Sequence, residues 1–391
     1  MKLPRSDTLE TRHPELWSDE PVFVTRPTMP SLAAYHEMLE GIWARRWLTN
    51  DGVLHRELEE KLRAYFGVRH FSLVSSGTTA LLIALQALEI TGGEVITTPF
   101  TFPATPHVLH WSRVTPVFCD LEADGFNLDP SQIVRLIRPE TKAILGVHAY
   151  GFPCDVEAIA EVADAHGLKV VYDAAHAVGV RRRGRSAVSY GDVSALSFHA
   201  TKLFSTGEGG GLVARSALAK RRVDLLRNFG IVSEEEVVTP GLNGKLSELH
   251  AAFGLLHLQH LEQEIAAREA VAGRYEALLS GVSGISLPTV PEGVRWNYAY
   301  YPIRVDEEAF GASRDRVYDA LKRCNIHPRK YFHPLCSRFP CYSSHPSAAP
   351  ERLPHAERVA SEVLCLPIYG TLEESTVERV CAAVVESSRV G

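Results

Sequence analysis

Short apolar runs alternate with helical patterns over the first two thirds of the chain. The apolar runs predict strands at 71–74, 94–98, 115–118, 143–148, 170–172, 193–198 and 211–214. Apolar side chains at helical spacing predict helices at 32–47, 54–66, 80–88 and 156–166. Strands that are apolar throughout and alternate with helices are typical of a largely parallel sheet covered on both faces. The pattern therefore predicts an α/β fold.

The pattern changes towards the C-terminus. Apolar positions predict one long helix over 246–268, followed by a strand at 298–305, a helix at 314–322, a strand at 363–366 and a closing helix at 373–385. The first 30 residues are rich in Pro, Asp, Glu and Arg, which predicts an extended arm. We therefore expect an arm at 1–30, a large α/β domain at 31–260 and a smaller α+β domain at 261–391.

Composition and charge narrow the class of protein. A length of 391 residues exceeds what one hydrophobic core usually supports, which favours two packed units. The formal net charge of −6 argues against a nucleic-acid partner. The seven cysteines lack metal-ligand spacing, which predicts reduced thiols and no metal site. There is no apolar N-terminal leader and no apolar window of bilayer length, so we expect a cytoplasmic protein without a membrane partner.

One lysine follows a buried strand and precedes a glycine-rich loop. Lys202 stands after the predicted strand 193–198 and before Gly207, Gly209, Gly210 and Gly211. Most lysines are solvated surface cations. A lysine in this setting can instead be desolvated, lose its proton and act as an amine nucleophile. The chemistry suited to such an amine is a Schiff base with an aldehyde cofactor, pyridoxal phosphate (PLP).

PLP requires a carboxylate for its pyridinium nitrogen. Asp173 stands at the carboxyl end of the predicted strand 170–172, where open α/β sheets present ligand-binding groups. A buried aspartate there would keep the ring nitrogen protonated. The alternative, that Asp173 caps a helix, is equally compatible with its position. His176 would donate to the phenolate oxygen of the cofactor or be an ordinary half-buried histidine.

PLP also requires a phosphate cradle and a stacking face. Ser76, Gly77, Thr78 and Thr79 lie between a strand and a helix, where free N–H groups and the helix dipole favour an anion. The same junction also suits plain N-capping. Ser197 offers a further hydroxyl to the phosphate, and the stretch 98–105 offers aromatic faces to a flat ring.

Six motifs together resemble a known family. They are SGTTAL from Ser76, TPFTFPAT from Thr98, VHAYGFPCDVEAI from Val147, DAAHA from Asp173, SFHATKLFSTGEGGG from Ser197 and GLNGKLSELHAAFGLLHL from Gly241. From about residue 27 onwards the sequence is similar to the PLP-dependent sugar-nucleotide aminotransferases of the DegT/StrS type. The resemblance implies the fold-type I aminotransferase architecture.

The resemblance also implies roles for individual residues. Lys202 would carry the cofactor and Asp173 would hold its ring nitrogen. The remaining contacts to the cofactor would come from Gly77, Thr78, Thr79, Phe102, His176 and Ser197, with Asn243 reaching the phosphate from the partner of a homodimer. Phe152, Gly244 and Lys245 differ from residues that are frequent in the family, which bears on substrate contacts.

The retained lysine favours transamination, because family members with dehydratase activity have histidine in its place. The stretches 47–52 and 325–335 look most like the VioA-type branch, which converts dTDP-4-keto-6-deoxyglucose to dTDP-4-amino-4,6-dideoxyglucose. The resemblance implies L-glutamate as amino donor and a dTDP-sugar as acceptor. Arg329, Lys330 and Tyr331 would contact that substrate or form a basic surface turn. A 3-keto sugar acceptor and a non-catalytic regulatory protein of the same fold remain alternatives.

Overall fold

A seven-stranded sheet organises the computed structural model, which describes residues 16–389. The strand order is β2 (Phe71–Val74), β10 (Gly210–Ala214), β9 (Val193–Ser197), β6 (Lys169–Asp173), β5 (Thr141–Val147), β3 (Glu94–Thr97) and β4 (Thr115–Phe118). Only β10 runs antiparallel to its neighbours β2 and β9. The predicted α/β fold with a largely parallel sheet is confirmed.

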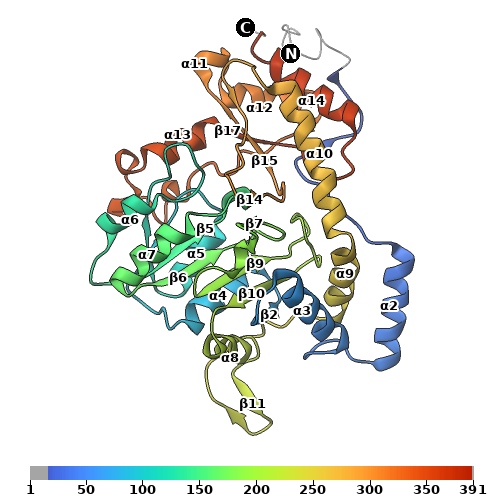
Figure 1. Cartoon of the computed structure of the whole chain (residues 1–391), viewed down its shortest axis with the longest axis vertical. Helices are drawn as coiled ribbons and strands as arrows, with labels where there is room; N and C mark the ends of the chain where they lie inside the picture. The colour runs from blue at the N-terminus through green and yellow to red at the C-terminus, as the bar shows by residue number, and fades with distance from the viewer. Residues whose placement is uncertain (1–15, 390–391) are drawn as a thin grey trace, which may run out of the picture.

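Helices cover both faces of this sheet, as Figure 1 shows. Successive residues of a strand point to opposite faces, so Val95 and Val171 pack in one apolar cluster and their neighbours Ile96 and Tyr172 in another. The first cluster includes residues of α4 (Gly77–Ala87), α5 (Ala104–Trp111) and α8 (Ala217–Leu226). The second includes residues of α6 (Pro130–Leu136) and α7 (Val156–His166). Burial on both faces explains why the strands are apolar throughout.

Two further helices cover the second face of the sheet at its β2 end. Residues of α3 (Val53–Phe66) and α9 (Glu248–Gln259) share a cluster with Phe71, Leu196 and Val213. Outside them lies α2 (Leu32–Arg45), and a hairpin of β11 (Ile231–Ser233) and β12 (Glu236–Val237) extends from the body below α8 (Figure 1).

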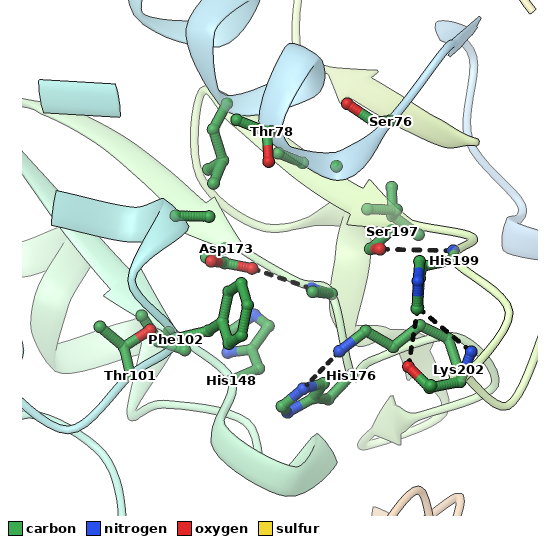
Figure 2. A pocket seen from close by; sticks show the side chains of 18 of the residues that line it. Ser76, Thr78, Thr101, Phe102, His148, Asp173, His176, Ser197, His199 and Lys202 are labelled. Atoms are coloured by element: carbon green, nitrogen blue, oxygen red, sulfur yellow. Dashed lines mark hydrogen bonds between the residues drawn. The ribbon is translucent and has the colours of Figure 1, made fainter. Parts of the chain in front are cut away.

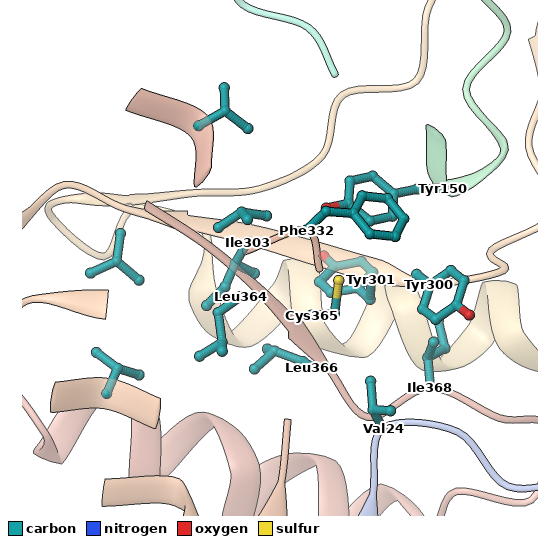
Figure 3. Close-up of a cluster of buried hydrophobic side chains, with 14 of the residues drawn as sticks. Val24, Tyr150, Tyr300, Tyr301, Ile303, Phe332, Leu364, Cys365, Leu366 and Ile368 are labelled. Carbon is teal, nitrogen blue, oxygen red and sulfur yellow. The ribbon is translucent and has the colours of Figure 1, made fainter. Parts of the chain in front are cut away.

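The C-terminal region builds a smaller antiparallel sheet, β13 (Ile285–Ser286), β15 (Tyr301–Val305) and β17 (Val363–Leu366). Figure 3 shows part of its buried cluster, in which Tyr150 and Phe332 stack with ring centroids 5.9 Å apart. The surrounding helices are α10 (Leu261–Leu279), α11 (Glu307–Phe310), α12 (Arg314–Arg323), α13 (Pro354–Glu362) and α14 (Glu374–Glu386).

The N-terminal segment packs on this region. Its strand β1 (Val22–Phe23) pairs in parallel with β16 (Ile326–His327), and Leu16, Val22 and Val24 are buried in the same cluster. The first half of the arm expected at 1–30 lies outside the described residues. The domain boundaries at 30 and 260 stay predictions.

The single helix predicted over 246–268 is wrong. The chain forms two helices, α9 and α10, which are separated at His260, where φ is −109° and ψ is 2°. Apolar periodicity shows which side chains face the core, but it continues across a change of helix axis when both helices bury the same side. The strand expected from residue 298 begins instead at Tyr301, because Tyr298 is left-handed with φ 53°. No helix within residues 16–389 is sufficiently long and apolar to cross a bilayer.

Candidate active site

The carboxyl ends of β6 and β9 and the first turns of α4 and α5 surround a cavity of about 290 Å³. Figure 2 shows side chains from α4, β6, β9 and the loop before α5 around this space. Seven of the nine residues expected to contact the cofactor line it: Gly77, Thr78, Phe102, Asp173, His176, Ser197 and Lys202. The tertiary structure thus brings together residues that lie up to 125 positions apart (77 and 202).

Asp173 lies at the end of β6, only 7% exposed. Its Oδ2 accepts a hydrogen bond from the hydroxyl of Thr105 at 2.8 Å, and its Oδ1 accepts one from the N–H of Ala175 at 3.1 Å. Burial raises the pKa of this carboxyl above its ordinary value of 3.8, against the hydrogen bonds and the charge of Lys202. Turns rather than a helix follow Asp173, so no helix begins there for it to cap.

Lys202 and His176 meet inside the cavity. Nζ of Lys202 is 3.0 Å from Nε2 of His176 (Figure 2). Burial lowers the pKa of Lys202, although Asp173 and Tyr331 act in the opposite direction. Burial, and then the charge of Lys202, lower the pKa of His176. A lysine with a lowered pKa is a better nucleophile and proton carrier near neutral pH.

The first turn of α4 faces the cavity from the opposite side. Ser76 is the N-cap, and its hydroxyl oxygen accepts the N–H of Thr79 at 3.1 Å. A Cβ on Gly77 would lie 2.8 Å from Cβ of Ser197, so only glycine permits this close approach. Backbone N–H groups and the helix dipole therefore favour an anion between Thr78 and Ser197, as expected from the sequence. Thr79 does not line the cavity, because its hydroxyl lies against those of Ser75 and Ser76.

The remaining predicted residues divide into those at the cavity and those away from it. Phe102 is 57% exposed and lines the cavity, as does Tyr331. Lys330 instead forms an ion pair with Asp315 on α12, with Nζ 2.6 Å from Oδ1. Arg329 and Asn243 are exposed and do not line the cavity.

Several residues that line the cavity or contact its side chains were missed in the sequence. Thr105 lies within the motif at 98–105, but nothing in the pattern connects it to Asp173. Tyr300 and Phe332 come from the C-terminal region and form one wall together with Tyr331. Their rings lie against His176, with the Tyr300 centroid at 4.8 Å and the Phe332 centroid at 6.2 Å. No local signal marks them, since aromatic residues in this region mostly belong to the core.

Comparison with known proteins identifies the family of this chain. Residues 33–385 match the DegT/DnrJ/EryC1/StrS aminotransferase family. The chain belongs to this family. It is 47% identical to an Escherichia coli dTDP-4-amino-4,6-dideoxy-D-glucose transaminase, over 93% of this chain and 98% of the relative. It is 42% identical to a transaminase of the same name from Shigella dysenteriae, over 94% of this chain and 99% of the relative.

The fold comparison agrees. The crystal structure of DesI in the presence of its TDP-sugar product superposes with a TM-score of 0.90 at 36% identity, covering 95% of this chain and 94% of DesI. The DegT/StrS chain is therefore an enzyme, a PLP-dependent aminotransferase of fold-type I.

The cavity of this DegT/StrS enzyme fits PLP. Asp173 is a buried carboxylate available to a pyridinium, Lys202 supplies the amine, and Phe102 exposes an aromatic face. The helix N-terminus at Gly77 lies where a phosphate would gain from the N–H groups. These placements support the assigned roles of the residues, which remain predictions.

Proposed function

We propose that this enzyme transfers an amino group from L-glutamate to C4 of dTDP-4-keto-6-deoxyglucose, giving dTDP-4-amino-4,6-dideoxyglucose. The observation that carries the proposal is the 47% identity, over nearly the full length of both chains, to a transaminase named for that product. The retained lysine in the cavity supports transamination. The reaction would be ping-pong, because donor and acceptor would use the same amine-carrying site in turn.

PLP, when bound, supplies the electron sink that lets the α-hydrogen of the donor leave as a proton. Asp173 would hold the ring nitrogen, with its carboxylate oriented by Thr105 and Ala175. Phe102 would stack on the ring, and Thr78, Ser197 and the N–H groups at Gly77 would bind the phosphate.

Lys202 would attach the cofactor and, once released, move the proton at its Nζ. Its pKa, lowered by burial, suits both taking up and giving back a proton near neutral pH. His176, 3.0 Å away, would fix the position of the amine and donate to the phenolic oxygen of the cofactor. The aromatic wall of Tyr300, Tyr331 and Phe332 would exclude water from this proton transfer.

The three residues proposed from the sequence as substrate contacts differ in how close they lie to the cavity. Tyr331 lines the cavity and can reach an acceptor sugar there. Arg329 is exposed, so it can contact only the outer, nucleotide part of a substrate. Lys330 is engaged with Asp315 and supports α12. The functional unit would be a cytoplasmic homodimer, with Asn243 of each chain acting in the site of its partner.

The test is incubation of the PLP-loaded enzyme with L-glutamate and a panel of nucleotide-linked keto sugars, with the position of the new amine assigned by NMR. We expect amination at C4 of the dTDP-linked 4-keto-6-deoxy sugar. Exclusive amination of a 3-keto isomer would replace this proposal with the 3-keto alternative. Absence of amination of every keto sugar in the panel would reject both of these acceptors.

A further inference from the structure

The imidazole of His176 lies between two nitrogen atoms, in one buried contact and one partly buried contact. Nδ1 is 3.1 Å from the backbone nitrogen of Tyr150, and Nε2 is 3.0 Å from Nζ of Lys202. His176 itself is only 8% exposed. The protonation of each ring nitrogen is therefore set by these two neighbours.

Only one arrangement of hydrogen atoms on His176 and Lys202 satisfies both contacts. A backbone amide can only donate, so Nδ1 must carry a lone pair. A neutral imidazole then has its proton on Nε2, and this N–H points at Lys202. An ammonium group has no lone pair with which to accept it. The contact is consistent only if Nζ is a free amine that accepts the hydrogen bond.

An unusual backbone turn places the Tyr150 amide. Tyr150 and Gly151 are both left-handed, with φ 56° and 89°. A Cβ on Gly151 would lie 2.5 Å from Oδ1 of Asn297 and 3.0 Å from the carbonyl oxygen of His176, so the turn requires glycine.

Asn297 connects this turn to the His176 loop. It is fully buried, and its Nδ2 donates to the carbonyl oxygens of His176 and Val178, both at 2.7 Å. Its Oδ1 accepts the N–H of Ala299 at 3.1 Å. The side chain thus fixes the backbone from which His176 projects.

We propose that the Tyr150 amide, held by the turn at Gly151 and by Asn297, locks His176 in the Nε2–H tautomer and thereby keeps Lys202 a free amine before the cofactor arrives. Gly151 and Asn297 are positioning residues in this arrangement, since they act through His176. A free amine can attack an aldehyde without prior loss of a proton. The inference rests on the proposed role of Lys202 as the attachment residue.

The other groups that face Lys202 shift its pKa in different directions. Asp173 and Tyr331 favour the ammonium form, and the Tyr300 ring, 5.8 Å from Nζ, also attracts a cation. Burial opposes them and lowers the pKa of Lys202 overall. Without an N–H donor at His176, the carboxylate of Asp173 would be the strongest of the groups that favour the ammonium form of Lys202.

The first experiment labels cofactor-free protein with trace acetic anhydride between pH 7 and 9, and quantifies each acetylated lysine by mass spectrometry. The labelling of exposed Lys142 should rise roughly tenfold per pH unit, as for an ordinary lysine. That of Lys202 should change less than about twofold over the range, because the amine is already free. A rise parallel to that of Lys142 would overturn the proposal.

Two substitutions of His176 test the donor. His176→Gln keeps an N–H donor and an acceptor, so its labelling should stay flat with pH. His176→Phe keeps a ring but offers no N–H, so Lys202 should be protonated beside Asp173 at pH 7. Its labelling should then rise with pH as this proton is lost. Flat labelling in His176→Phe would show that burial alone keeps the amine free and would overturn the role of His176.

A further pair tests the turn. Gly151→Ala should displace the Tyr150 amide and make Lys202 labelling depend on pH. Gly311→Ala is the matched control, because Gly311 has a similar φ of 85° but nothing within 4 Å of an added Cβ. Equal labelling profiles in the two variants would contradict the role of the turn.

The tautomer is read directly in wild-type protein from ¹⁵N-histidine NMR, with the His176 signal identified by its loss in His176→Gln. We expect Nε2 protonated and Nδ1 unprotonated from pH 6 to 9. A protonated Nδ1, or titration to imidazolium within this range, would overturn the proposal. These measurements need no sugar or donor, so a wrong substrate assignment would leave their outcome unchanged.

Discussion

The hydroxyl of Thr105, on α5, donates to Oδ2 of Asp173 at 2.8 Å. Both groups are buried, and the Thr105 hydroxyl lies 2.7 Å from that of Thr101. Because Thr105 gives its hydrogen to the carboxylate, Thr101 must donate to Thr105. This chain of hydroxyls favours the charged form of Asp173, whereas burial favours the neutral form. Burial is the larger effect, so the pKa of Asp173 is raised overall.

Thr105→Val should therefore raise the pKa of Asp173 further, since it removes the donor while keeping the shape of the side chain. We expect the acidic limb of the pH–rate profile to move to higher pH and kcat/KM at neutral pH to fall about tenfold, as for the loss of a hydrogen bond to a charged group. Thr105→Ser keeps the hydroxyl and should restore the profile. A Thr105→Val profile that overlays the wild type would show that this hydrogen bond is irrelevant to catalysis.

Asp173→Asn removes the charge while keeping the size of the side chain. Turnover should fall about 10²- to 10³-fold, as for other losses of a preorganised electrostatic group. Activity within a few-fold of wild type, measured with saturating PLP, would mean that Asp173 does not act on the cofactor.

The same variant should stabilise the cofactor-free protein. The pKa of Asp173 is raised in the folded state, so between its ordinary value of 3.8 and the folded value the folded protein binds more protons than the unfolded chain. Stability therefore falls as pH rises through this window, and the cost persists at pH 7. Asp173→Asn lacks this cost, so its melting temperature should exceed that of wild type at pH 7, with a gap that narrows as pH falls towards 4. A melting temperature of Asp173→Asn below that of wild type at pH 7 would contradict the expected stabilisation.

Gly77→Ala tests the close approach of α4 to β9. The added Cβ would lie 2.8 Å from that of Ser197, so the helix start must shift and PLP should dissociate more readily. The matched control is Gly273→Ala in α10, where nothing lies within 4 Å of an added Cβ. That change should stabilise the protein by about 0.5–1 kcal/mol, the usual gain for alanine within a helix. PLP retention is measured by absorbance after dialysis. Equal retention in both variants would refute the role of the α4 N-terminus in binding the phosphate of PLP.

Lys202 should be the residue that carries the cofactor. Borohydride reduction of the PLP-loaded enzyme followed by peptide mapping should place the pyridoxyl group on the peptide that contains Lys202. Lys202→Ala should bind PLP only non-covalently and lose turnover. Finding the label on another lysine would overturn the assignment.

Asn243 is expected to act in the site of the partner chain. It is exposed and away from the cavity of its own chain, and Asn228 pairs with it in an isolated bridge. Lys202→Ala and Asn243→Ala proteins are unfolded, mixed and refolded. If Asn243 acts in trans, each mixed dimer has one intact site, and roughly a quarter of wild-type activity should return at limiting PLP. Activity no higher than the mean of the two parents, with mixed dimers demonstrated, would reject a shared site.

The sequence alone was sufficient for the strands of the sheet and for the two residues on which the proposed chemistry centres. Parallel strands buried on both faces appear as continuous apolar runs, so β3, β5, β6 and β9 could be read without knowing their neighbours. Asp173 and Lys202 could be found because each follows such a run, at the edge where α/β sheets present their ligands.

Only the tertiary structure decided what surrounds them. Thr105 reaches Asp173 from 68 positions away, and Asn297 reaches His176 from 121. Such contacts follow from how helices and strands pack, not from local periodicity, and the same is true of the break at His260. The backbone amide of the left-handed residue Tyr150 lies 3.1 Å from Nδ1 of His176, 26 positions away, and no local pattern in the sequence indicates this contact.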